Sequence, residues 1–261
     1  MIFRRQIGWL VAQAYVLSGA RARAVARVRR PGTVLPIVFH AAEPEEVRSI
    51  LGWLRRAGLL ERCDLTFDDG WRQFLRTVPV LEEFDKSATL FIAPGQTLRG
   101  RVWTDGTTIA QRQALYGEGE GRRNERLAEW GVPDDRRLMS EAEVREVARH
   151  PLVAIGNHTW SHLSCPHRPV DEVMAEVRRA QEVLTEWCGR APTEFAYPFG
   201  RGTAELDTAI RAMGLNVHYT RQGLVTEETR GAARNMVYEG KSLSENIGRL
   251  LTAWRKVGET L

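Results

Sequence analysis

The sequence predicts an α/β protein in which parallel strands form one sheet or barrel. Short apolar segments rich in β-branched and aromatic residues alternate along the chain with longer segments whose apolar residues recur every three or four positions, a pattern typical of parallel sheets. The segment 88–93 is apolar throughout, as expected of a strand covered on both faces. With 261 residues, 43% of them hydrophobic, the chain can bury a core of single-barrel size.

Each predicted strand is a short apolar run that ends in polar or turn-forming residues. In chain order these strands are 34–39, 64–67, 88–93, 152–155, 194–197 and 216–220. Each predicted helix has one apolar face. In chain order these helices are 45–57, 71–84, 140–149, 171–187, 203–213 and 242 to about 256. Ser140 with Glu143, and Ser242 with Glu245, form capping boxes at two helix starts, whereas Pro79 predicts a kink or short break in the second helix.

Acidic and imidazole side chains follow two of these strands. Asp68 and Asp69 stand where strand 64–67 ends, and His158 and His162 follow the strand that ends near residue 155. Catalytic groups of α/β folds gather at such strand ends, and adjacent carboxylates persist best where a cation or proton separates them. Two imidazoles and one carboxylate can hold a divalent metal with an open coordination position, which leaves the second carboxylate as a general base. The pattern predicts a metal-dependent enzyme.

Three segments, in this order and spacing, resemble the first three motifs of the polysaccharide deacetylases, carbohydrate esterase family four, which share a nodulation-type chitooligosaccharide deacetylase homology domain. They are Thr66-Phe67-Asp68-Asp69-Gly70, His158-Thr159-Trp160-Ser161-His162 and Phe195-Ala196-Tyr197-Pro198-Phe199-Gly200. The resemblance covers roughly residues 33–225. It implies an α/β fold of the distorted (β/α) barrel type with fewer than eight strands, about seven, in a single domain that spans residues 33–261.

The resemblance also implies roles for individual residues. Asp69, His158 and His162 would hold the metal, usually Zn²⁺, with Co²⁺, Ni²⁺ and Mn²⁺ as alternatives. Asp68 would be the general base, and the backbone N–H of Phe199 would bind the oxyanion. Tyr197, Pro198 and Gly200 complete the third motif and are expected to contact substrate.

Two departures from the family pattern concern proton transfer. The position of the arginine that normally orients the base is Ala196, so we consider Arg201 and Arg72 as replacements. No late histidine is present to protonate the departing amine, since His218 comes too early and is interpreted as structural. His40 ends the first strand and should open towards the same pocket, so it is a candidate catalytic residue.

The alternation of strands and helices stops between about residues 95 and 139. This long insertion is rich in Gly, Arg and Glu, and it leaves the strand that follows the Asp-Asp-Gly motif, so we expect it over the catalytic mouth. Trp103 could stack on a sugar face, and Arg101 could reach a phosphate. The alternative is a variable surface insertion with its own small helices.

Residues 1–32 are predicted to contain a basic amphipathic helix. Its apolar run, Ile7 to Ala20, is shorter than the about 20 residues that cross a bilayer, and the arginines that follow it oppose export. The helix would pack on the barrel bottom or make peripheral contact with an anionic membrane surface. The three cysteines have no metal-finger spacing and favour a reducing compartment. We therefore expect the protein in the cytoplasm, peripheral to the inner membrane if the helix rests there.

The function predicted from these features is removal of an N-acetyl group from an amino sugar, in the biosynthesis of a surface glycan on a nucleotide-linked or lipid-linked saccharide. The net charge of +4, without a basic stripe interleaved with aromatic residues, argues against nucleic acid as a partner. Two alternatives stay open: a hydrolase of a small amide or ureide, and a catalytically impaired sugar-binding barrel. The sequence predicts no oligomeric state.

Overall fold

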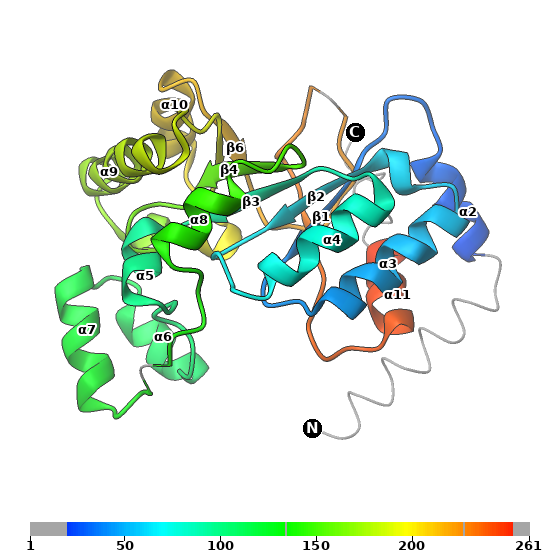
Figure 1. The fold of residues 1–261 in the computed structure, drawn as a ribbon. Coiled ribbons are helices and arrows are strands. Elements are labelled where there is room, and N and C mark those ends of the chain that lie inside the picture. The colour runs from blue at the N-terminus through cyan, green and yellow to red at the C-terminus, as the bar shows by residue number, and fades with distance from the viewer. Residues whose placement is uncertain (1–19, 134, 227, 253–261) are drawn as a thin grey trace.

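Seven parallel strands form one curled sheet, a half-barrel with helices around it (Figure 1). The computed structural model describes residues 20–133, 135–226 and 228–252. The strands are β1 (Leu35–Phe39), β2 (Cys63–Phe67), β3 (Ala88–Ile92), β4 (Val153–Asn157), β5 (Glu194–Ala196), β6 (Asn216–His218) and β7 (Asn235–Met236). Their order across the sheet is β6-β5-β4-β3-β2-β1-β7, and neighbouring strands run parallel. The predicted barrel of about seven strands in one domain is confirmed.

Helices connect the strands as the alternation predicted. They are α2 (Ala20–Val28), α3 (Pro44–Arg56), α4 (Phe74–Phe84), α5 (Pro94–Arg99), α6 (Ile109–Leu115), α7 (Glu120–Glu129), α8 (Glu141–Val147), α9 (Val170–Cys188), α10 (Ala204–Ala212) and α11 (Leu243–Thr252). Ser140 and Glu143 form the predicted capping box of α8. The predicted break at Pro79 is wrong, because α4 continues through it. Pro79 is the sixth of the eleven helix residues, and its missing N–H leaves without a helical hydrogen bond only the carbonyl of Leu75, in the first turn.

The strand registers bring the polar residues that follow the strands to one edge of the sheet. Phe39 of β1 pairs with Phe67 of β2, and the N–H of Asp68 donates to the Phe39 carbonyl over 2.9 Å. The N–H of His158 donates in the same way to the carbonyl of Ile92, over 3.0 Å. The residues that follow β2 and β4 are therefore held by the sheet itself.

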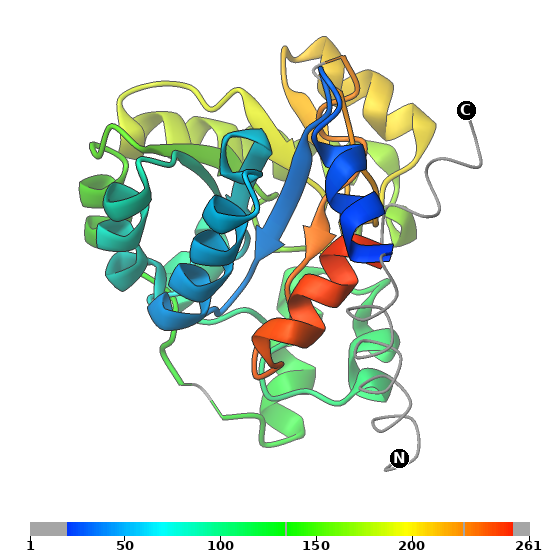
Figure 2. The ribbon, with the colours of Figure 1, turned by 90° about the vertical axis from the view of Figure 1, so that its right-hand side faces the viewer.

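Strand β7 was not predicted. It has only two residues, too few to produce a hydrophobic pattern, and it pairs with β1 (Figure 2). The residues just after β6 are also hydrogen-bonded to those just before β7. The N–H of Tyr219 donates to the Gly231 carbonyl over 2.8 Å, and the N–H of Arg234 donates to the Arg221 carbonyl over 3.0 Å. This segment closes the curled sheet.

The insertion folds into α5, α6 and α7, which group together at one side of the molecule (Figure 1). These helices have a hydrophobic core of their own. Its buried members are Trp103, Leu115 and Leu127. Phe199, from the third motif, is one of the partly buried side chains that pack against this small core.

Most of the predicted N-terminal helix, including the apolar run from Ile7, lies outside the described residues. The part described, α2, lies beside α11 (Figure 2) and buries Ala24 and Val28. Among the described helices, none combines the length and apolar character that a bilayer-spanning segment needs.

Candidate metal centre and active site

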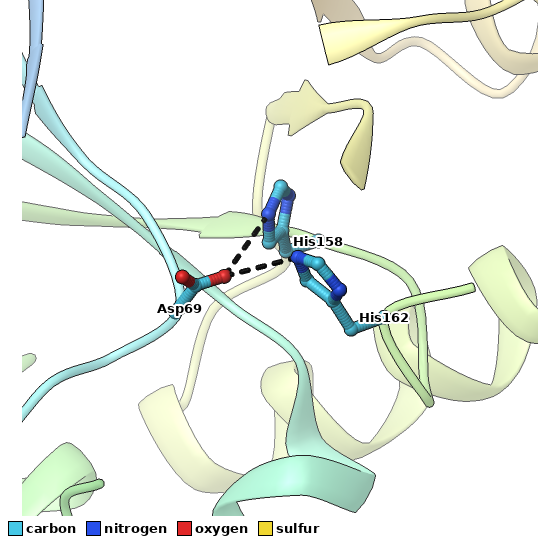
Figure 3. Close-up of side chains that lie close together, drawn as sticks. All are labelled: Asp69, His158 and His162. Carbon is cyan, nitrogen blue, oxygen red and sulfur yellow. Dashed lines mark ion pairs between the residues drawn. The ribbon is translucent and has the colours of Figure 1, made fainter. Parts of the chain in front are cut away.

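Three side chains from separate parts of the chain meet at the edge of the sheet. Asp69 follows β2, His158 follows β4, and His162 lies four residues further on; one ligand atom from each lies within 4.8 Å of the others. The Asp69 Oδ1 atom lies 3.5 Å from His158 Nε2 and 3.1 Å from His162 Nε2. Figure 3 shows the Asp69 carboxylate pointing towards the imidazole rings of His158 and His162. The predicted convergence of these three residues is confirmed.

The hydrogen bonding at this cluster fits a cation. His158 Nδ1 lies 2.7 Å from the Ala196 carbonyl, which can only accept a hydrogen, so in the neutral imidazole the Nε2 lone pair is directed towards Asp69. Asp69 Oδ1 is buried and has no hydrogen-bond partner among the described residues. A lone pair and an anionic oxygen facing each other in a buried site repel unless a positive charge lies between them. The donor set of two imidazole nitrogens and one carboxylate oxygen is that of catalytic zinc sites.

The protonation states favour the same interpretation. Burial raises the pKa of Asp69, but His162 and His158 outweigh it and hold that pKa well below its usual range. Burial lowers the pKa of His162, against the opposing effect of Asp69. The carboxylate is therefore ionised and His162 tends to be neutral, which are the forms that bind a metal.

The loop that carries the two histidines is backbone-strained. Thr159 has φ 63° and His162 has φ 53°, in the left-handed region that residues with a Cβ rarely adopt. Such residues persist only where the surroundings hold them. One such contact comes from the insertion, because Trp103 Nε1 donates to the His162 carbonyl over 2.7 Å.

Asp68 forms a buried fork-to-fork pair with Arg234. The guanidinium donates from Nη1 to Oδ1 over 2.6 Å and from Nη2 to Oδ2 over 2.9 Å. It also donates to the hydroxyls of Thr66 and Thr220, over 3.2 Å and 3.0 Å. Arg234 is fully buried and Asp68 is 3% exposed. Two parallel hydrogen bonds fix both the position and the plane of the carboxylate.

Arg234 therefore takes the place of the missing arginine, and the predicted replacements are wrong. Arg72 is exposed and donates twice to Glu143 at the start of α8. Arg201 is also exposed. Both stand close in sequence to a motif, whereas Arg234 stands 166 positions from Asp68. The only local signal was an arginine inside the apolar run Ala232 to Val237.

Arg234 also keeps Asp68 ionised. Burial raises the pKa of the Asp68 carboxyl, but the charge of Arg234, with smaller contributions from His158 and His40, outweighs burial and lowers the pKa below its ordinary value. Asp68 is thus an ionised carboxylate at neutral pH, next in the chain to Asp69 of the cluster.

His40 is a second basic side chain near Asp68. Its Nε2 atom is 4.0 Å from Asp68 Oδ2, and its side chain is 27% exposed. The structure therefore places His40 at the site, as its position at the end of β1 predicted. His218 lies away from the cluster, with Nε2 2.6 Å from Glu194 Oε2, which fits its interpretation as a structural residue.

The third motif forms a tight turn beside the cluster of Asp69, His158 and His162. Phe199 has φ 59°, and its ring centroid is 4.9 Å from that of His162. Tyr197 and Pro198, predicted to contact substrate, have buried side chains, and Tyr197 donates its hydroxyl to Asp207 over 2.8 Å. Gly200 is also buried. A Cβ there would lie 2.6 Å from the backbone nitrogen of Thr220, so no larger residue fits.

The insertion places its predicted substrate residues differently from the expectation. Trp103 is 2% exposed, and Arg101, at 5%, donates to the carbonyls of Pro133 and Asp105. Arg101 is therefore directed into the insertion, and Trp103 lies between the insertion and the loop of His162. Tyr116 of the insertion is half-buried and stacks on the exposed ring of His167, with centroids 5.1 Å apart.

Comparison with known proteins agrees with this geometry. Residues 61–218 match the sequence model of the polysaccharide deacetylase family. The fold is similar to a Streptococcus pyogenes deacetylase, PplD, in complex with acetate (TM-score 0.58, 15% identity, covering 84% of this chain and 98% of that one). It is also similar to IcaB from Ammonifex degensii (TM-score 0.59, 19% identity, covering 84% and 97%).

A third similar structure is a de-N-acetylase from Aggregatibacter actinomycetemcomitans (TM-score 0.56, 14% identity, covering 80% and 96%). At these identities the structures show a shared fold, while the sequence match spans more than half of the chain and contains all three motifs. The match indicates a hydrolase that acts on acetyl groups of a saccharide. The chain belongs to the polysaccharide deacetylase family.

Proposed function

We propose that this protein is a metal-dependent N-deacetylase that converts an N-acetylated amino sugar to the free amine and acetate. The observation that carries the proposal is the cluster of Asp69, His158 and His162 beside the buried pair of Asp68 and Arg234. A metal-ligand set with an adjacent ionised carboxylate is suited to amide hydrolysis by water.

The first proton transfer is assigned to Asp68. A divalent metal held by the three ligands would act as a Lewis acid towards the acetamide carbonyl and lower the pKa of water. Asp68 accepts the proton of the attacking water, and Arg234 holds the carboxylate in the required plane. The new C–O bond forms as this proton moves to Asp68.

The second proton transfer is assigned to His40. Breaking the C–N bond expels an amine, which must gain a proton as it leaves. His40 is the described imidazole beside Asp68 that is outside the cluster, and its partial exposure lets a substrate reach it. His40 protonated at Nε2 would donate to the amine nitrogen, and acetate would be the second product.

The oxyanion is assigned to the turn of the third motif. Its left-handed Phe199 lies against His162, next to the metal ligands. A backbone N–H held there by a fixed turn can stabilise negative charge without rearranging during the reaction. We therefore retain Phe199 as the backbone donor of the site.

We further propose that the substrate is a nucleotide-linked or lipid-linked saccharide on its way to a surface glycan, and that the enzyme works in the cytoplasm. Support for the compartment comes from Cys63, Cys165 and Cys188, all free thiols. Peripheral contact with the inner membrane through residues 1–32 is part of the same proposal. Zn²⁺ is the proposed metal, with Co²⁺, Ni²⁺ and Mn²⁺ to be compared in the same assay.

The proposal is tested by metal-dependent acetate release. Purified protein is stripped with a chelator, reloaded with each metal, and incubated with UDP-linked and oligosaccharide N-acetyl sugars. Mass spectrometry should find loss of about 42 Da, the replacement of acetyl by hydrogen, only in the reloaded samples. Metal-loaded protein that releases no acetate from any of these sugars would contradict an N-deacetylase.

Two observations argue against the alternative functions, an impaired sugar-binding barrel and a hydrolase of a small amide or ureide. The impaired-barrel hypothesis depended in part on the missing arginine, and Arg234 now fills that role. The hydrolase of a small amide or ureide is disfavoured by the match to a family that acts on saccharides.

A further inference from the structure

We infer, on the basis of the proposed function, that the insertion positions the metal ligands and that Arg123 of α7 is the residue through which it does so. Arg123 touches neither the metal ligands nor the base. It acts on the loop between His158 and His162, through Ser161.

Arg123 is an unusual residue within its helix. The neighbouring charged residues Arg122, Glu125 and Arg126 are exposed, whereas Arg123 is 1% exposed. Burial lowers the pKa of Arg123 to about 10, so it remains charged at neutral pH. Burying a charged guanidinium is costly unless it makes specific hydrogen bonds. The partners of these hydrogen bonds therefore indicate the role of the Arg123 side chain.

The hydrogen bonds of Arg123 go to Ser161, which lies between His158 and His162 in the second motif. Arg123 Nη2 donates to the Ser161 carbonyl over 2.9 Å and to the Ser161 hydroxyl over 2.5 Å. The hydroxyl then donates to Glu176 Oε1 over 2.8 Å, and the Ser161 N–H donates to Glu176 Oε2 over 2.7 Å. Ser161 is thus held from both sides, by α7 of the insertion and by α9 of the barrel.

A second contact from the insertion holds the next residue. Trp103 Nε1 donates to the His162 carbonyl, and the Arg123 guanidinium lies 5.2 Å from the centre of the Trp103 ring. The two contacts are therefore linked by a cation–π interaction. Together they hold consecutive residues of the loop, one of which is a proposed ligand.

The loop needs such support because it is strained. Thr159 and His162 have φ of 63° and 53°, a strained conformation that residues with a Cβ keep only where the surroundings hold it. Without the contacts to Ser161 and His162, the backbone is free to relax and to turn the imidazoles away from Asp69. Metal ligation tolerates only a few tenths of an ångström, so relaxation weakens metal binding.

The same insertion also supports the third motif. The Phe199 side chain packs on the core formed by Trp103, Leu115 and Leu127, and Phe199 itself has φ 59°. One element therefore supports both the metal-ligand loop and the proposed oxyanion turn. The insertion contributes to the geometry of the site in addition to any contact with substrate.

The test measures binding of Co²⁺ alone to the metal-free full-length protein, with a competing chelator and with the visible absorption of Co²⁺ as a record of its coordination. Arg123→Met should weaken binding about 10- to 100-fold and change the absorption spectrum, as removal of outer supporting groups does. Arg122→Met is the matched control, because Arg122 is the preceding residue of the same helix and its side chain is 52% exposed. The control should bind Co²⁺ like the wild type.

A role in folding alone would lower the melting temperature of Arg123→Met and leave the dissociation constant and spectrum unchanged; that result would overturn the inference. Arg123→Lys and Glu176→Gln keep part of the network, and both should bind Co²⁺ with intermediate affinity. If Arg123→Met does not fold, these two variants decide, and wild-type affinity in both would contradict the inference. A wild-type protein that binds no Co²⁺ would instead refute the proposed function.

Discussion

Asp68 and Asp69 are neighbours in the chain, and the structure gives them different surroundings. Asp69 turns Oδ1 towards two imidazole nitrogens, while both oxygens of Asp68 are taken by the guanidinium of Arg234. An oxygen pair that already accepts two strong hydrogen bonds is poorly available as a metal ligand, but it can still accept a proton from water. These different partners are the reason that Asp69 is proposed as a metal ligand and Asp68 as the base.

Substitution of the proposed base and substitution of a proposed metal ligand should therefore affect metal binding and turnover differently. Asp68→Asn should retain the metal and lose most turnover, because the amide cannot accept the proton of water. His162→Ala should lose metal affinity as well as activity. Metal content after dialysis, measured with acetate release, tests both. An Asp68→Asn enzyme with wild-type turnover would remove Asp68 from the role of base.

Arg234 is expected to be sensitive to a conservative change. Arg234→Lys keeps the charge but not the planar fork, so the carboxylate loses its fixed orientation and kcat should fall by up to about 100-fold. Arg230→Lys is the control, since Arg230 also donates from two nitrogens to one carboxylate, that of Asp64, with a side chain that is 47% exposed. The control should keep kcat near the wild-type value. Equal kcat in both variants would show that the fork is dispensable.

The role of His40 can be isolated by the choice of leaving group. His40→Ala should lose most activity on an N-acetyl sugar, because the amine must be protonated as it leaves. On p-nitrophenyl acetate the same variant should lose much less, since a nitrophenolate leaves without a proton. Rates on both substrates, measured at equal metal content, test this. A uniform loss on both substrates would point to a role other than proton donation.

At the scale of elements, the segment that closes the sheet delivers Arg234. The carbonyl of Gly231 accepts from Tyr219, and the residues after it run into β7 beside β1. Gly231 has φ 88°, and a Cβ there would clash with the carbonyl oxygen of Val217. The approach of these two backbones therefore requires glycine.

Gly231→Ala should destabilise the fold and displace Arg234, with an expected cost of about 2 kcal/mol or more from the clash and the left-handed backbone together. Gly240→Ala is the matched control, because Gly240 also has positive φ, 68°, but has open space around its Cβ position. It should show only the backbone part of that cost. Urea denaturation of both variants measures the difference, and equal losses would exclude the clash as a cause.

At the scale of the whole molecule, the pairing of β5 with β6 brings a carboxylate of one strand to polar side chains of the other. Glu194 of β5 accepts from Asn216 and lies 2.6 Å from His218, both of β6. Burial raises the pKa of Glu194, but the hydrogen bonds from His218 and Asn216 outweigh it, so the pKa is lowered. Glu194 therefore links the stability of the fold to pH.

A lowered carboxyl pKa contributes stability above the unfolded value and loses it as pH falls through the folded value. Wild-type protein should thus lose stability on acidification from pH 6 towards pH 3 through this residue, among others. Glu194→Gln should be less stable than wild type at pH 6 and should show a shallower fall with acid. Unfolding free energies at several pH values test this, and parallel profiles would exclude Glu194 as a source of the pH dependence.

The sequence by itself determined the alternation of strands and helices, the family, and the three residues of the metal cluster. These follow from local patterns, since apolar periodicity indicates each element and parallel strands carry the residues that follow them to one edge of the sheet. Asp69, His158 and His162 each stand directly after a strand or within the loop that follows it, so their convergence could be expected.

Only the tertiary structure decided how that cluster is supported. Arg234 meets Asp68 across 166 positions, and Arg123 meets Ser161 across 38, and in each case the arginine lies in a segment with no motif of its own. Trp103 and Arg101 turn inwards because the insertion builds a small core, which its charged and irregular sequence did not indicate. Long-range pairing of buried polar groups depends on how segments pack, and packing is a property of the folded chain as a whole.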